Sequence, residues 1–189
     1  MAENTEKRKA TRARLTEALA ELCQKKSYYD ITVGEICREA GLYRSTFYRY
    51  YDTKDQMLRE IEETYVEETR KLTAGVRSYR RDAPEEVRAG YLEELTRDME
   101  YHLENRKLCC FLLSPAGDLY FHRKLVESVG EAAGRELCRG GMDETDAAYF
   151  VSFFANGFIA AIYEWLRRRD LGPREMAALL LDMIGRMQN

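Results

Sequence analysis

Residues 32–51 read TVGEICREAGLYRSTFYRYY, and this stretch decides the fold of the N-terminal part of the chain. Thr32 followed by Glu35 is the pattern of a capping box, in which the hydroxyl accepts a hydrogen bond from an unpaired amide and the carboxylate reaches back to the helix start. The pattern predicts a helix over 33–40. Gly41 marks its end, because glycine readily adopts the left-handed conformation that closes helices.

A second short helix, predicted over 44–51, follows the turn at Gly41 and completes a helix-turn-helix layout at 32–51. The side chains that we expect in its core are Ile36, Cys37, Ala40, Leu42 and Phe47, and we favour the core for Tyr50 and Tyr51 as well. The other side chains are rich in hydrogen-bond donors: Tyr43, Arg44, Ser45, Thr46, Tyr48 and Arg49. Burying them together would leave polar groups unpaired. The pattern therefore favours a surface that contacts phosphates and base edges in a DNA major groove.

Outside this stretch, apolar residues recur at spacings of three and four, which is the periodicity of amphipathic helices. The sequence predicts an all-α fold with helices at 5–26, 33–40, 44–51, 54–80, 84–104, 106–113, 115–138, 144–169 and 173–187. The short helices precede residue 52 and the long ones follow it. We therefore expect two domains, a three-helix helix-turn-helix domain at 1–53 and a larger helical domain at 54–189.

The charge of the whole chain conceals a difference between its two parts. The chain has 30 Lys and Arg against 33 Asp and Glu, a formal net charge of −3. Residues 1–55 hold 11 basic and 9 acidic side chains, whereas the remaining residues hold 19 and 24. A slightly basic N-terminal part and an acidic remainder are compatible with DNA contact through the N-terminal part alone.

The composition excludes several classes of protein. The longest apolar runs, at 108–113 and 158–163, have six residues each, whereas a helix that spans a bilayer needs about 20. The N-terminal residues are charged where a secretory signal would be apolar. We therefore expect a cytoplasmic protein with no membrane partner. Its five cysteines are then reduced thiols rather than disulfides.

No segment has the spacing of a catalytic or metal site. There is no glycine-rich phosphate loop, and His102 and His122 lie far apart without neighbouring ligands. The adjacent Cys109 and Cys110 point about 100° apart on a helix, and we favour buried small side chains over a thiol-responsive pair. We expect neither catalysis nor a cofactor nor a metal.

These motifs resemble the TetR/AcrR family of bacterial transcriptional regulators. The family pattern appears in order as Thr32-Val33, Ile36-Cys37, Ala40-Gly41, Thr46-Phe47-Tyr48-Arg49-Tyr50-Tyr51 and Lys54-Asp55-Gln56-Met57-Leu58. The resemblance covers about residues 9–69, a third of the chain. It implies a DNA-binding domain followed by a helical domain for ligand binding and dimerisation.

The resemblance also implies which residues contact DNA. They are the recognition helix and its flanks: Thr32, Tyr43, Arg44, Ser45, Thr46, Tyr48, Arg49 and Lys54. Thr32 and Lys54 are the expected anchors on the DNA backbone, and Tyr48 is the expected phosphate contact. Tyr43 stands where many members have a small polar cap, so either Ser45 or a water caps the helix or Tyr43 itself contacts DNA. The basic run in residues 1–14 is either an arm or a first helical turn along the phosphates, or a solvated tail.

The last two predicted helices resemble those that pair across the family's dimer interface. The candidate interface residues are Phe154, Gly157, Phe158, Ala161, Trp165, Leu179, Leu180, Met183 and Met187. Glycine and alanine permit close approach of two helices, while the aromatic residues supply apolar area. A palindromic DNA site also needs two copies of the helix-turn-helix. The alternative, that this face packs only within its own chain, stays open.

The family commonly holds a small-molecule effector among its middle helices. The candidates here are Tyr91, Leu95, Tyr101, His102, Leu108, Phe111, Leu112, Phe121 and Phe150. For any one of these positions, an ordinary core is favoured over a pocket, because apolar positions in a helical body are more often core.

Taken together, the residues and the resemblance predict a ligand-responsive repressor that binds a palindromic operator as a homodimer. The alternative is a coregulator or ligand-binding protein of the same fold without operator binding of its own.

Overall fold

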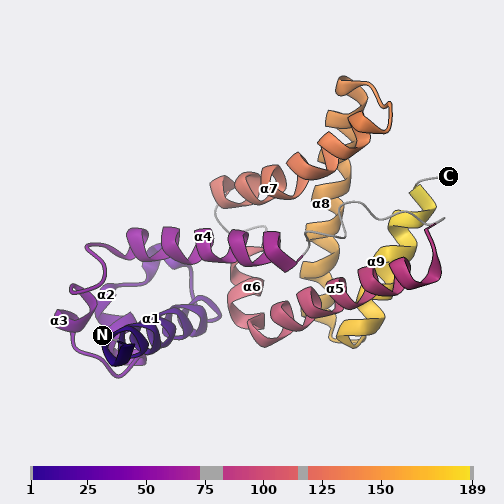
Figure 1. Cartoon of the computed structure of the whole chain (residues 1–189). Coiled ribbons are helices and arrows are strands. Elements are labelled where there is room, and N and C mark those ends of the chain that lie inside the picture. Colours follow the sequence, from indigo (N-terminus) through magenta and orange to yellow (C-terminus); the bar gives the residue numbers. More distant parts are fainter. Residues whose placement is uncertain (1, 73–82, 115–118, 188–189) are drawn as a thin grey trace. The chain divides into compact units, whose positions relative to one another are not determined.

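The structure is a computed structural model that describes residues 2–72, 83–114 and 119–187. Every regular element in these ranges is a helix, so the predicted all-α fold is confirmed (Figure 1). The chain divides into two compact units, Met1–Thr64 and Tyr65–Asn189. The division falls inside helix α4 (Lys54–Leu72), whereas the prediction placed the domain boundary between residues 53 and 54.

The first unit contains α1 (Ala2–Cys23), the 3-10 turn η1 (Tyr28–Asp30), α2 (Val33–Glu39), α3 (Arg44–Phe47) and the beginning of α4. The α-helices and the segments beside them supply its core, to which η1 contributes no buried side chain. The core contains Leu15, Leu19, Ile31, Ile36, Cys37, Phe47, Tyr51, Met57 and Ile61. Burying each large aliphatic or phenylalanine side chain stabilises the unit by about 1.5–3 kcal/mol. Two residues that were expected in the core, Leu42 and Tyr50, are only half-buried.

The predicted capping box at the start of α2 is present. The Thr32 hydroxyl accepts a hydrogen bond from the Glu35 amide at 3.3 Å, and the Glu35 carboxylate accepts one from the Thr32 amide at 3.0 Å. Lys26 donates to the same carboxylate at 2.8 Å. The hydrogen bond from Lys26, followed by those from Thr32, lowers the pKa of Glu35 to about 2. At the other end of the helix, Gly41 has a φ of +62°, the left-handed conformation expected of it.

Helix α3 ends at Phe47, although the sequence predicts a helix to residue 51. The amides of Arg49 and Tyr50 donate to carbonyls three residues back, at Thr46 and Phe47, rather than four. Such tighter turns are common where a helix ends. The recognition segment, residues 44–51, therefore consists of one α-helical turn followed by tighter turns with hydrogen bonds between residues three apart.

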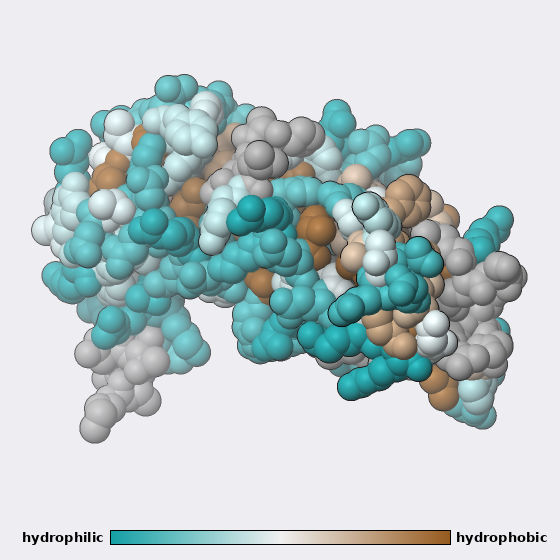
Figure 2. Space-filling model, turned by 90° about the horizontal axis from the view of Figure 1, so that it is seen from above, coloured by the Kyte–Doolittle hydropathy of each residue, from teal (hydrophilic) through white to brown (hydrophobic). Residues whose placement is uncertain are grey.

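The second unit contains the rest of α4 with α5 (Glu85–Glu104), α6 (Arg106–Leu112), α7 (Leu119–Arg139), α8 (Glu144–Arg168) and α9 (Pro173–Met187). Helix α5 packs along α9, and α7 packs along α8 (Figure 1). A Cβ at Gly130 of α7 would collide with Val151 of α8, so glycine permits the close approach of these two helices. Figure 2 shows hydrophilic side chains over most of the face in view, interrupted by small apolar patches.

Helix α8 has a defined beginning and end. Asp143 accepts a hydrogen bond from the Thr145 amide at 2.8 Å, and such backbone donors lower the pKa of Asp143. Arg169 closes the helix in a left-handed conformation, with φ of +60°. By length and composition, α8 is also the one helix in the described ranges that is able to cross a membrane, with a mean hydropathy of 1.3 over its most apolar window. The sequence prediction of no membrane partner considered only uninterrupted apolar runs, which have at most six residues, whereas this window includes polar residues.

Candidate functional site

The donor-rich residues of α3 and its flanks lie on the surface of the first unit. Tyr43 and Tyr48 have 83% and 55% of their surface exposed, which is unusual for large aromatic residues. Arg44, Ser45 and Arg49 are also exposed, and Thr46 is half-buried. Phe47 is completely buried and fixes the helix to the core below. The sequence-predicted contact residues of this segment are therefore together on one accessible surface.

No side chain caps α3. Tyr43 occupies the N-cap position and accepts no hydrogen bond there from a backbone amide of α3. Its ring therefore extends away from the unit, as its exposure requires. A helix start whose amides are not occupied by a cap is able to donate to an anion such as a phosphate oxygen.

The Arg44 side chain lies against the neighbouring helix. A Cβ at Gly34 of α2 would collide with the Arg44 guanidinium, so the guanidinium passes directly over the Gly34 backbone. Burial raises the pKa of the Cys37 thiol, and the positive charge of Arg44 partly offsets this rise. The glycine thus provides the space that positions this guanidinium at the edge of the α2–α3 surface.

Lys54 has a different role from the predicted DNA anchor. Its ammonium donates to the carbonyl oxygens of Tyr28, Tyr29 and Ile31 at 3.0, 3.1 and 2.8 Å. It also lies 4.5 Å from the centre of the Tyr28 ring. These three acceptors use all three donors of an ammonium group. Lys54 therefore holds the η1 turn against the start of α4 and has no proton left for a phosphate.

The basic residues near the N-terminus belong to a helix rather than to an extended arm, because α1 begins at Ala2. Arg14 donates to the Ala40 carbonyl at 2.6 Å, where α2 ends. Arg12 forms an ion pair with Glu60 at 2.7 Å. The run therefore belongs to a helix, as the first-turn alternative expected, and Arg12 and Arg14 make contacts within the unit.

A cluster of polar side chains is buried inside the second unit. Asp98 and His102 lie one turn apart on α5, with 3.4 Å between Oδ2 of Asp98 and Nε2 of His102. On the other side of the ring, Nδ1 lies 3.2 Å from the hydroxyl of Tyr65 on α4 and 3.8 Å from Sγ of Cys109 on α6. All four side chains have at most 2% of their surface exposed.

The charges in this cluster depend on Asp98. Burial alone would lower the pKa of His102, but the Asp98 carboxylate outweighs it and raises the pKa to about 10. His102 is therefore an imidazolium at neutral pH, and both ring nitrogens carry protons. Burial raises the pKa of Tyr65 well above its ordinary value, so its hydroxyl stays protonated.

The cluster leaves hydrogen-bonding capacity unused. Within the described ranges, three buried atoms of the cluster have no hydrogen-bond partner: the two carboxylate oxygens of Asp98 and Nε2 of His102. The 3.4 Å contact between the two side chains is too long for a good hydrogen bond and is better regarded as an ion pair. Native structures leave few buried polar atoms in this condition.

Five of the predicted pocket residues are buried in the second unit: Leu95, His102, Leu108, Leu112 and Phe121. The other four are half-buried: Tyr91, Tyr101, Phe111 and Phe150. Tyr65 brings three of the nine together, because its ring contacts those of Tyr101, His102 and Phe121 at centroid distances of 6.1, 5.6 and 5.8 Å. Phe150 instead stacks on Phe154 within α8.

Sequence reasoning missed Tyr65 and Asp98. The spacing of Asp98 and His102, four residues apart, was the available signal, since it places the two side chains on one helix face.

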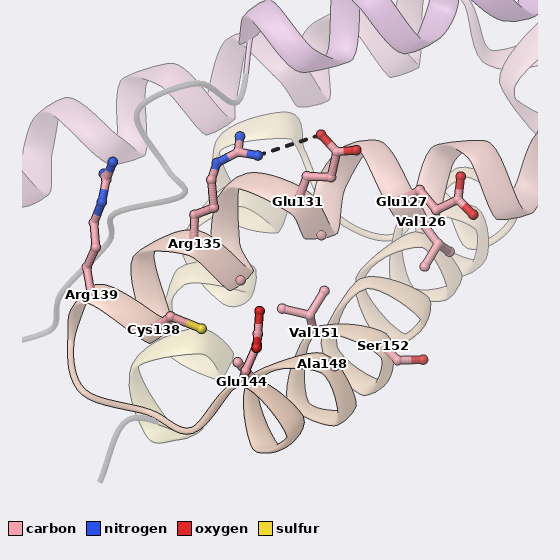
Figure 3. A pocket seen from close by; sticks show the side chains of 13 residues that line it. Val126, Glu127, Glu131, Arg135, Cys138, Arg139, Glu144, Ala148, Val151 and Ser152 are labelled. Carbon is pink, nitrogen blue, oxygen red and sulfur yellow. Dashed lines mark ion pairs between the residues drawn. The ribbon is translucent and has the colours of Figure 1, made fainter.

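A separate open groove lies between α7 and α8, with a volume of about 760 Å³ (Figure 3). Its small and apolar lining residues are Val126, Gly130, Gly134, Ala147, Ala148 and Val151. Figure 3 shows Glu131 and Arg135 on the α7 side of the groove. None of the predicted pocket residues lines it.

The candidate dimer residues occupy different environments. Trp165 and Leu180 are buried within the single chain, and the Trp165 indole donates to the Leu171 carbonyl at 2.9 Å. Trp165 and Leu180 therefore belong to the internal core rather than to a free face. Gly157, Leu179 and Met183 are exposed, whereas Phe154, Phe158 and Ala161 are half-buried. The side chain of Met187 lies outside the described part of the chain.

The exposed face of α8 is displaced from the predicted one. Tyr149 and Phe153, which the prediction omitted, have 76% and 73% of their surface exposed. With Gly157 and Ala160 they form a stripe at spacings of three and four. On α9, Leu179 and Met183 have 44% and 50% exposed.

Two family profiles match the chain. The profile of bacterial regulatory proteins of the tetR family matches residues 15–61, and that of a transcriptional regulator C-terminal region matches residues 91–186. The first contains the helix-turn-helix, and the second contains most of the second unit. Comparison with curated proteins found no match.

Several solved structures have a similar fold. A TetR transcriptional regulator from Streptococcus agalactiae 2603V is 21% identical, with a TM-score of 0.61 over 97% of this chain and 99% of that chain. A TetR-family regulator from Bordetella parapertussis 12822 is 20% identical, with a TM-score of 0.64 over 91% and 92%. One from Syntrophomonas wolfei is 17% identical, with a TM-score of 0.65 over 93% of each chain.

Proposed function

Because the chain belongs to the TetR family of bacterial transcriptional regulators, we propose that it binds a palindromic operator as a homodimer and represses transcription until a small-molecule effector binds. The observation that carries the proposal is the exposed, donor-rich surface of α3. Two exposed tyrosines, two exposed arginines and an uncapped helix start lie within residues 43–49, a segment that the buried Phe47 fixes to the core. Such a surface suits the edges of bases and the phosphates beside them.

Homodimerisation is supported by the exposed stripe on α8 and by the exposed apolar residues of α9. Large aromatic residues such as Tyr149 and Phe153 are costly to leave in water, and aromatic residues are enriched in interfaces. Gly157 and Ala160 in the same stripe permit a second helix to approach closely. Two copies related by a twofold axis would present two recognition segments to successive major grooves.

An effector response is supported by the buried polar cluster around His102. The cluster, with its contact between Tyr65 and His102 and its buried atoms that have no hydrogen-bond partner, lies in the second unit, where the family binds ligands. An effector changes operator affinity only to the extent that it binds the two states of the protein differently. A cytoplasmic location accompanies this proposal, since the operator is there.

The experiment is selection of bound sequences from random duplex DNA. Wild-type protein is expected to enrich a palindrome, while Arg44→Ala and Tyr48→Ala variants enrich it weakly or not at all. Arg123→Ala on α7 is the matched control, because it removes the same charge from an exposed position in the other unit. Failure of the wild-type protein to enrich any motif would contradict the proposal and favour a coregulator without operator binding.

A further inference from the structure

Three parts of the first unit meet at the carboxylate of Glu60 on α4. Its Oε1 accepts a hydrogen bond of 2.7 Å from the Arg12 guanidinium of α1. The same oxygen accepts a hydrogen bond of 3.0 Å from the hydroxyl of Tyr51, the last residue of the recognition segment. The Arg12 guanidinium also lies 5.5 Å from the centre of the Tyr51 ring. Each of the three side chains therefore contacts the other two, and together they join α1, α4 and the end of the recognition segment.

The hydrogen bond from Tyr51 is the contact with the largest energetic consequence. The side chains of Arg12 and Glu60 are 40% and 38% exposed, and ion pairs at exposed positions contribute little because water screens them. Tyr51 has only 2% of its surface exposed, and a buried hydroxyl without an acceptor is costly. Burial, followed by the charge of Glu60, raises the pKa of Tyr51 well above its ordinary value. The hydroxyl therefore keeps its proton and remains the donor to Glu60.

The recognition segment needs such contacts because it has little helical structure of its own. Helix α3 contains only four residues, and helices this short are unstable in water unless packing supports them. Beyond α3, the amides of Arg49 and Tyr50 donate to carbonyls three residues back. The conformation of the segment is therefore set by the side chains that attach it to the rest of the unit.

Tyr51 connects Glu60 to the exposed side of the recognition segment. The centre of its ring lies 5.6 Å from that of Phe47, and the Phe47 ring lies 5.6 Å from that of Tyr48 in an edge-on arrangement. Phe47 and Tyr51 are buried, whereas Tyr48 is exposed and is the expected phosphate contact. Protein interiors are close-packed, so a shift of one ring displaces its neighbours. Glu60 is thus connected to Tyr48 through two buried rings.

We propose that Glu60 is a positioning residue for DNA recognition: its carboxylate holds Tyr51, and through Tyr51 it keeps residues 48–51 in the conformation that binds the operator. This inference rests on the operator binding in the proposed function. Glu60 itself does not contact DNA in this role. It sets the fraction of molecules whose recognition segment is competent to bind, and a lower fraction weakens the apparent affinity by the same factor.

Amide hydrogen exchange followed by NMR tests this role in the free protein. Tyr51→Phe keeps the ring and removes only the hydroxyl. It is expected to speed exchange of the Tyr50 and Tyr51 amides by about tenfold relative to the Ala40 amide at the end of α2, because a hydrogen bond to a charged group has about this effect on an equilibrium. Destabilisation of the whole unit would instead speed the exchange of all three amides together.

Tyr28→Phe is the matched control. The Tyr28 hydroxyl also donates to a carboxylate of the first unit, that of Asp55, at 2.6 Å. Tyr28 lies in η1, however, and not in the recognition segment. The control is expected to leave the exchange of the Tyr50 and Tyr51 amides and the affinity for the operator as they are in wild type.

Two substitutions of Glu60 separate its acceptor oxygen from its other properties. Glu60→Leu removes the acceptor and is expected to speed exchange of the Tyr50 and Tyr51 amides at least as much as Tyr51→Phe does. The double variant is expected to behave like Glu60→Leu alone, because both changes break the same hydrogen bond. Glu60→Gln keeps an acceptor oxygen on a side chain of the same length, and it is expected to restore most of the wild-type protection.

Electrophoretic mobility shift measures the consequence for DNA binding, on the palindrome that the wild-type protein selects. Tyr51→Phe and Glu60→Leu are each expected to weaken binding by about tenfold, the same factor as the loss of competent molecules. Tyr51→Phe changes no charge and removes no phosphate contact, so the salt dependence of binding is expected to stay as in wild type. A smaller salt dependence for this variant would show that Tyr51 contacts DNA directly and would overturn the positioning role.

The inference is also overturned if Tyr51→Phe leaves the exchange of the Tyr50 and Tyr51 amides unchanged, if Tyr28→Phe speeds it equally, or if Tyr51→Phe binds the operator as tightly as wild type. If Glu60→Leu fails to fold by circular dichroism, Tyr51→Phe and Glu60→Gln still decide the test. Normal operator binding by Tyr51→Phe would remove this inference alone. A wild-type protein that selects no DNA sequence would remove the proposed function, while the exchange rates, measured without DNA, would still show whether Glu60 orders the recognition segment.

Discussion

The ammonium of Lys54 donates a hydrogen bond of 2.8 Å to the carbonyl oxygen of Ile31, the residue that follows η1. This contact joins the start of α4 to the segment that leads into α2. Ile31 itself is buried in the core of the unit. We therefore expect Lys54 to stabilise the helix-turn-helix through these backbone contacts rather than to contact DNA.

Replacing Lys54 with methionine is expected to lower the free energy of unfolding of the first unit by about 2 kcal/mol, because hydrogen bonds to a charged group typically contribute about 1.5–3 kcal/mol. Urea denaturation followed by circular dichroism measures the change. Lys25→Met, which alters an exposed lysine in the same unit, serves as the control. Unchanged stability together with weaker operator binding would show instead that Lys54 acts on the DNA.

The capping box gives stability a dependence on acid. The folded pKa of Glu35, about 2, lies below its ordinary value of 4.5, so the carboxylate stabilises the fold above pH 4.5. That contribution is lost as the pH falls from 4.5 through about 2. Glu35→Gln is therefore expected to be less stable than wild type at pH 6, and the difference is expected to shrink by pH 2. Equal stability of the two proteins at pH 6 would argue against this role.

The pair of His102 and Asp98 gives the opposite dependence. The pKa of His102 rises from 6.5 to about 10 on folding. Its stabilisation is therefore complete below pH 6.5 and is lost as the pH increases through about 10. Urea denaturation between pH 6 and pH 10 is expected to show a larger loss of stability for wild type than for His102→Gln. Tyrosines and cysteines also ionise in this pH range, but they affect the free energy of unfolding of both proteins, so the difference between the two proteins reports on His102.

The exposed arginines of the recognition segment are expected to affect operator binding in different ways. Arg44→Ala, at the start of α3, is expected to weaken binding of the selected operator by about 1–3 kcal/mol and to relax sequence preference. Arg49→Gln is expected to weaken binding to all sequences and to reduce the salt dependence by about one phosphate contact. Electrophoretic mobility shift at several salt concentrations distinguishes them. Identical salt slopes for Arg49→Gln and wild type would contradict the phosphate assignment.

The stripe on α8 is expected to decide the oligomeric state. Phe153→Glu places a charge in the middle of an exposed aromatic surface and is expected to weaken the dimer by about 2 kcal/mol or more, the range of an interface hot spot. Analytical ultracentrifugation measures the change. Tyr120→Glu alters a comparably exposed aromatic residue on α7 and is expected to leave the dimer intact. Dissociation by both variants would indicate general destabilisation rather than an interface.

The sequence was most informative where structure depends on local spacing. The capping box of Thr32 and Glu35 and the Asp143 cap follow from residues three apart or fewer, and the core positions Ile36, Cys37 and Phe47 follow from helical periodicity. In these cases the partner is a near neighbour in the chain, so the pattern specifies the contact.

Contacts between distant segments were not accessible in the same way. Lys54 reaches carbonyls more than twenty residues away, and Tyr65 meets His102 across 37 residues. Trp165 lies in a stripe that is apolar on more than one side, so periodicity alone did not distinguish its inward position from the outward position of Phe153. Which side of such a helix is covered depends on the packing of its neighbours.

The position of Trp165 also gives the protein a natural optical reporter. It is the chain's single tryptophan, it lies at the end of α8, and its indole donates to the Leu171 carbonyl in the connection to α9. Its fluorescence therefore reports on the second unit alone. Emission that changes at a different urea concentration from the helical signal of the whole chain would reveal that the two units unfold independently, without any label attached to the protein.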